Sequence, residues 1–118
     1  MVNLASIRKA KKTRKKNLQK ALNNILNQLK KIGVIKVFFF GSFNEDNIDL
    51  YSDLDLLVIM PNSKTTKEWI NLIYSNLERR IATDLVIFNE EDFGNMLPKS
   101  SFLDNIIKNG KKIYETTE

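Results

Sequence analysis

The chain has 118 residues and contains neither cysteine nor histidine, which excludes disulfides, Ser-His-Asp or Cys-His catalysis, and zinc sites of the usual ligand types. Its net charge of +5 is unevenly spread, because eight basic residues lie between Arg8 and Lys20 and the remainder is slightly acidic. The length and the hydrophobic share of 42% predict a single globular domain over residues 1–118, with residues 1–17 as a basic N-terminal helical arm.

No apolar run approaches the ~20 residues of a membrane span. The N-terminus lacks the apolar core of a signal peptide, so a cytoplasmic location is expected. The basic stretch from Arg8 to Lys20 has three interpretations: a solvated helix face, a surface that docks on an acidic partner, or a contact to nucleic acid. The last is weakened because the stretch has no aromatic residue to stack on bases.

The first half of the chain predicts one long helix and two buried strands. Residues 4–32 form a helix with one apolar stripe that ends at Gly33, and residues 1–14 are expected to fray or protrude. The stripe consists of Leu18, Leu22, Ile25, Leu29 and Ile32. Residues 34–40 and 54–60 are short and apolar, as is typical of strands that are buried on both faces, and a loop of about ten residues separates them.

The second half predicts a helix over 64–80, a strand over 83–88 and a helix start at 89–93. An amphipathic helix over 102–108 and a short edge strand over 111–115 complete the chain. The aromatic residues of the apolar segments, Phe38, Phe39, Phe40 and Trp69, are interpreted as core. The expected fold class is α+β, a two-layer α/β arrangement in which a small mixed sheet of three to four strands packs against helices.

Two aspartates open the second strand. Asp53 and Asp55 are two residues apart, so their side chains share one face of the strand. Carboxylates held so close repel unless a cation lies between them, and Mg²⁺ prefers such oxygen ligands. Asp84 opens the next strand, and it reaches the same end of the sheet if the two strands are neighbours in register. Three aspartates could then hold two metal ions for phosphoryl transfer.

Gly41 and Ser42 follow the first strand directly. Glycine lets a backbone approach a ligand closely, and free N–H groups with a hydroxyl can bind phosphate oxygens. Each feature alone has a plain alternative: a solvated Asp-x-Asp at a strand end, an ordinary Gly-Ser turn, and Asp84 as a turn cap. Their conjunction favours a phosphate and metal site.

The pattern Gly-Ser, ten residues, Asp-x-Asp resembles the signature of the DNA polymerase β-like nucleotidyltransferase superfamily. The surrounding segments "GVIKVFFFGS", "SDLDLLVIM", "TDLVIF" and "SFLDNIIKNGKKIYE" resemble its smallest branch, the minimal nucleotidyltransferases (MNT), over roughly residues 20–115. The resemblance implies an antitoxin that pairs with a HEPN-domain RNase toxin. It also implies transfer of AMP from Mg-ATP to a tyrosine hydroxyl of that toxin.

The resemblance implies a role for each matching position. Asp53, Asp55 and Asp84 correspond to metal-binding and catalytic carboxylates, with Asp84 also helping to deprotonate the acceptor, and Gly41 and Ser42 correspond to the phosphate-binding turn. The cofactor is then Mg²⁺, as two ions, with ATP as co-substrate.

The loop from Phe43 to Ser52 departs from the family pattern. It lacks the arginines that often follow Gly-Ser, and it carries three acidic residues, Glu45, Asp46 and Asp49. Their charge opposes ATP binding, although salt screens exposed charges. Arg79, Arg80 or a lysine of the arm could compensate, and Tyr51 could contact a base.

Three functional hypotheses follow. The first is the AMP-transferring antitoxin, and the small size of the chain favours an acceptor site on a partner protein. The second is a protein of the same fold that neutralises its partner by binding alone. The third is a small basic nucleic-acid-binding module.

Overall fold

The computed structural model describes residues 4–40, 54–78 and 83–116, the first twelve of these as backbone only. The elements in chain order are α1 (Leu4–Ile32), β1 (Lys36–Phe40), β2 (Leu54–Met60), α2 (Thr66–Asn76), β3 (Thr83–Asn89), α3 (Glu90–Met96), a 3₁₀ turn (Leu97–Lys99), α4 (Ser101–Asn109) and β4 (Lys111–Glu115). None of the helices in these ranges is long and apolar enough to cross a membrane.

Helix α1 uses the predicted apolar stripe. Leu18, Ile25 and Leu29 are buried, and the helix ends at Gly33 as expected. Gly33 has a φ of 111°, a left-handed conformation that only glycine adopts readily. It lets the N–H of Val34 return to the carbonyl of Leu29, at 3.1 Å, and turns the chain into β1.

The sheet has four strands in the order β3-β2-β1-β4. Strand β1 is antiparallel to β2 and to β4, whereas β2 and β3 are parallel and are joined by the crossover helix α2. The short C-terminal strand predicted at 111–115 is present and forms one edge of the sheet. Because β2 and β3 run in the same direction, both begin at the same end of the sheet.

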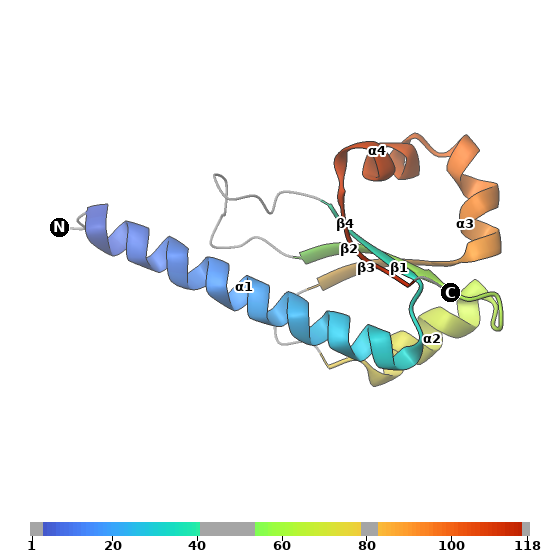
Figure 1. The fold of residues 1–118 in the computed structure, drawn as a ribbon, viewed down its shortest axis with the longest axis horizontal. Helices are drawn as coiled ribbons and strands as arrows, with labels where there is room; N and C mark the ends of the chain where they lie inside the picture. Colours follow the sequence, from blue (N-terminus) through green and yellow to red (C-terminus); the bar gives the residue numbers. More distant parts are fainter. Residues whose placement is uncertain (1–3, 41–53, 79–82, 117–118) are drawn as a thin grey trace.

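Helices cover both faces of the sheet (Figure 1). Helices α1 and α2 pack on one face, where Leu56 and Val58 of β2 meet Leu29 and Trp69 in one apolar cluster. The opposite face packs against α3 and α4 in a second cluster. The predicted fold class, a small mixed sheet packed against helices, is confirmed, and the helices form a layer on each side where one layer was expected.

Helix α2 is shorter than the predicted 64–80. It begins after Thr65, whose side chain accepts from the N–H of Glu68 while the Glu68 carboxylate accepts from the N–H of Thr65, a complete capping box. Leu77 is extended and ends the helix. Trp69 is buried, as predicted, and its Nε1 donates to the carbonyl of Pro61 at 2.7 Å.

The N-terminal half of α1 extends past the end of the sheet at which β2 and β3 begin (Figure 1). In the described part of this segment the backbone is continuously helical from Leu4. The basic stretch thus lies at the same end of the molecule as the first residues of β2 and β3.

Candidate active site

Asp55 and Asp84 are register partners in the parallel pair of β2 and β3. Neighbouring strands lie about 4.8 Å apart, so the two carboxylates start from adjacent backbone positions. The condition set by the sequence, that the two strands be neighbours in register, is therefore met. Asp55 is half-buried and Asp84 is exposed, so the pair lies at the surface of the sheet end.

The two aspartates share the face that carries α3 and α4. Side chains two positions apart point to the same face of a strand. Asp55 is therefore on the face of Leu57, and Asp84 is on the face of Val86. Leu57 is buried in the cluster beneath α3 and α4, and Val86 packs against it.

Phe40, the last residue of β1, continues this row. It pairs with Asp55 across the antiparallel ladder, and it packs on the same apolar cluster. Its ring meets the ring of Phe102 from α4 edge to face, with centroids 5.6 Å apart and an interplanar angle of 84°. Phe102 is 51% exposed. Phe40, Asp55 and Asp84 thus form a row of cross-strand neighbours at the end of the sheet, and Phe102 contacts the aromatic member of that row.

The donor set fits a hard divalent cation. Carboxylate oxygens on adjacent strands are the ligands that Mg²⁺ takes, usually together with substrate phosphates. Asp55 and Asp84 are the described residues that would hold the ion. Within the described residues no group of three or more candidate metal ligands occurs.

Several predicted site residues lie outside the described residues. They are Gly41, Ser42, the loop from Phe43 to Ser52 with Tyr51, Asp53, Arg79 and Arg80. Their roles stay predictions. Of the three aspartates, the structure places Asp55 and Asp84 together.

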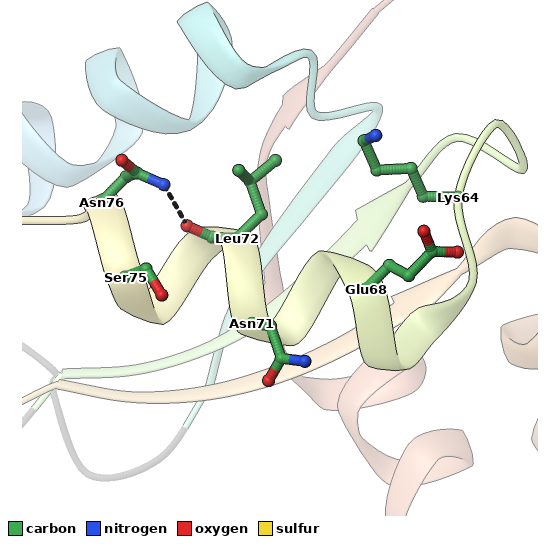
Figure 2. Close-up of a pocket in the computed structure, with 6 residues that line it drawn as sticks. All are labelled: Lys64, Glu68, Asn71, Leu72, Ser75 and Asn76. Atoms are coloured by element: carbon green, nitrogen blue, oxygen red, sulfur yellow. Dashed lines mark hydrogen bonds between the residues drawn. The ribbon is translucent and has the colours of Figure 1, made fainter.

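A shallow pocket on α2 lies away from the aspartates. Its lining consists of Lys64, Glu68, Asn71, Leu72, Ser75 and Asn76 (Figure 2). Its polar groups serve the helix itself: Glu68 belongs to the capping box, and Asn76 donates to the carbonyl of Leu72 at 2.8 Å. Because α2 packs on the face of the sheet opposite to Asp55 and Asp84, this pocket does not contribute to the candidate site.

Two carboxyl groups outside the candidate site have a lowered pKa, and hydrogen bonds within their own elements explain both shifts. Hydrogen bonds from the backbone and side chain of Thr65 lower the pKa of Glu68. A hydrogen bond from Lys112 lowers the pKa of Glu115, and Lys36 adds to the effect. Both groups stabilise the ends of elements outside the candidate site.

The sequence did not predict the aromatic part of the site. The apolar pattern predicts Phe40 as core, whereas the structure places it half-buried at the sheet end. For Phe102 the pattern predicts only that it belongs to an amphipathic helix. The available signal was its position: Leu103 and Ile106 form the buried stripe of α4, and Phe102 lies outside that stripe.

A comparison of the sequence with models of protein families agrees with the geometry of the site. Residues 20–118 match the family model described as Polymerase beta, Nucleotidyltransferase. Neither a curated protein nor a solved structure gave a match. The match covers most of the chain, including β2 and β3 with their paired aspartates. The chain belongs to the polymerase β-type nucleotidyltransferase family.

Proposed function

We propose that this protein is a Mg²⁺-dependent nucleotidyltransferase that transfers AMP from ATP to a tyrosine hydroxyl of a cognate HEPN-domain RNase toxin, as its antitoxin. The family supports nucleotidyl transfer in general. The observation that carries the proposal is the pairing of Asp55 with Asp84 at one end of the sheet. The resemblance of the sequence to the minimal nucleotidyltransferases supports the protein acceptor.

The chemistry assigned to the site is a single displacement. The acceptor hydroxyl oxygen bonds to the α-phosphorus of ATP, the bond from that phosphorus to the bridging oxygen breaks, and pyrophosphate leaves. Asp84 is the group proposed to take the hydroxyl proton, because it is exposed and the chain has no histidine. The bound Mg²⁺ would neutralise charge on the phosphates.

The half-buried Asp55 is proposed to be mainly a ligand. A carboxylate fixed by its strand would hold a cation, and Asp84, its register partner on the neighbouring strand, would act on the incoming hydroxyl. In this proposal Asp53 completes the metal site, and Gly41 and Ser42 bind the triphosphate.

The alternative is a protein of this fold that neutralises its partner by contact alone. The specific observation that favours it is the loop from Phe43 to Ser52, which has no arginine and carries Glu45, Asp46 and Asp49. These charges oppose a triphosphate at the neighbouring aspartates.

The test is to mix the protein with its HEPN partner, Mg²⁺ and ATP and to weigh the denatured partner by mass spectrometry. A covalently attached AMP survives denaturation, so the partner should gain the mass of one nucleotide. Chelation of the metal should prevent the gain. A partner that is inhibited yet unmodified would contradict the enzymatic proposal and support the contact inhibitor.

A further inference from the structure

An exposed aromatic ring contacts Phe40, the register partner of Asp55. Phe102 leaves 51% of its surface exposed, although aromatic rings contribute most when buried. Its one described ring partner is Phe40, which holds it edge to face at 5.6 Å. Phe102 thus contacts Phe40 on one side, while its exposed surface is open to another molecule.

The ring belongs to a series of neighbouring residues that ends at the paired carboxylates. The ring of Phe102 contacts the ring of Phe40, Phe40 is the register partner of Asp55, and Asp55 is the register partner of Asp84 on β3. One end is aromatic and the other is acidic.

A nucleoside triphosphate has the complementary chemistry. Its phosphates require a cation held by carboxylates, and its base offers a flat π-face. We propose that Phe102, supported by Phe40, is the platform on which the nucleobase stacks when the phosphates lie at Asp55 and Asp84. This inference rests on the proposed function, and it names the element that positions the nucleotide.

Stacking also predicts the selectivity of the platform. Every base has a π-face, so a phenylalanine ring binds bases with little discrimination between them. Neither Phe102 nor Phe40 offers a side-chain hydrogen bond to the edge of a base. ATP and GTP should therefore bind with similar affinity at this platform.

The test measures binding by titration calorimetry in Mg²⁺ and needs no acceptor. The wild-type protein, Phe102→Ala and Phe102→Trp are each titrated with ATP and with inorganic tripolyphosphate, which has no base. Phe102→Ala should weaken ATP binding about tenfold and leave tripolyphosphate binding unchanged, since stacking acts on the base alone. Phe102→Trp should retain the affinity for ATP.

Ile107→Ala is the matched control, because Ile107 is an exposed apolar residue on the same helix. It should change neither titration. Phe102→Leu adds a second test, since it keeps an apolar contact to Phe40 without a π-face, and it should weaken ATP binding as well. Unfolding midpoints of all variants identify any loss of fold.

Three results would overturn the platform: ATP affinity that is unchanged in Phe102→Ala, equal weakening for ATP and tripolyphosphate, or a wild-type protein that binds ATP no better than tripolyphosphate. Failure of the proposed AMP transfer would give a different result in these experiments. Phe102-dependent ATP binding without modification of the HEPN partner would reject AMP transfer and leave the platform in place.

Discussion

Asp55 and Asp84 lie directly opposite each other in a parallel pair of strands, although a whole helix separates them in the sequence. Their spacing is fixed by backbone hydrogen bonds of the sheet, and so it does not depend on the packing of flexible side chains. The crossover through α2 brings them together because both strands then begin at the same end of the sheet.

Replacement of Asp84 by Asn should lower Mg²⁺-dependent nucleotide transfer by about 10²-fold or more, the usual loss when a general base is removed. The fold should remain, because Asp84 is exposed and its negative charge lies beside that of Asp55. Transfer rates and thermal unfolding of the same sample measure the two effects.

Asp104→Asn is the matched control for this experiment. Asp104 lies on α4 and pairs with Lys108 at 2.9 Å on the surface. Its replacement should leave the transfer rate unchanged. Wild-type transfer by Asp84→Asn would remove Asp84 from the catalytic assignment.

Gly110→Ala should destabilise the protein by about 1–3 kcal/mol, as is usual when atoms are forced into a packed site. A Cβ at this position would lie 2.5 Å from the carbonyl oxygen of Ile106 and 3.0 Å from that of Phe39, and backbone atoms cannot turn away. Chemical denaturation measures the change in the free energy of unfolding.

The matching control is Gly94→Ala on α3, where an added Cβ meets no atom within 4 Å. Because alanine favours helix over glycine, this variant should be as stable as the wild type or up to about 1 kcal/mol more stable. Equal losses for the two glycines would show that close packing at Gly110 is unimportant.

Deletion of residues 1–14 should leave the domain folded, because the described apolar contacts of α1 begin at Leu18. Leu29→Ala should cost about 2–5 kcal/mol, since Leu29 is completely buried. The thermal unfolding midpoints of the truncated protein and of Leu29→Ala are each compared with that of the wild type. A midpoint lowered by tens of degrees on truncation would place the arm in the core.

The decrease in the free energy of unfolding at acid pH should depend on Glu68. The pKa of Glu68 is lowered in the folded protein by the hydrogen bond from the N–H of Thr65, from an ordinary value of 4.5. The unfolded chain therefore binds more protons near that pH, and the contribution of Glu68 is present above 4.5 and lost as the pH falls through the folded pKa.

The measurement is the free energy of unfolding against pH for the wild type and Glu68→Gln. The variant keeps a side chain that can accept from Thr65 but does not titrate, so its curve should be flatter below pH 4.5. Identical acid limbs for the two proteins would show that the capping box contributes nothing to the pH dependence.

Much of the fold could be predicted from the sequence, because apolar periodicity fixes where elements lie. The bounds of β2 were predicted as observed, and α1 stops at Gly33. The end of α2 was misplaced, because Leu77 continues the apolar spacing and yet is extended. Periodicity reports which residues are buried, and it does not report where the backbone stops making helical hydrogen bonds.

The sequence predicts the part of the candidate site that lies at the first residues of strands. Asp55 and Asp84 could be placed at strand openings from local pattern, whereas their pairing required the strand order β3-β2-β1-β4. The contact of Phe40 with Phe102 joins a strand to a helix far along the chain. No local spacing encodes such a contact, because it depends on how α4 crosses the sheet.

The one tryptophan of the chain gives the molecule a built-in optical reporter. Trp69 is buried and its indole N–H donates a hydrogen bond to the carbonyl of Pro61. Pro61 directly follows β2, so it lies about 20 Å along the strand from Asp55, at the opposite end of the sheet. Its fluorescence should shift to the red when the domain unfolds, because the indole then enters water. Nucleotide at the other end of the sheet should leave the emission unchanged, so unfolding curves recorded with and without ATP can be compared directly.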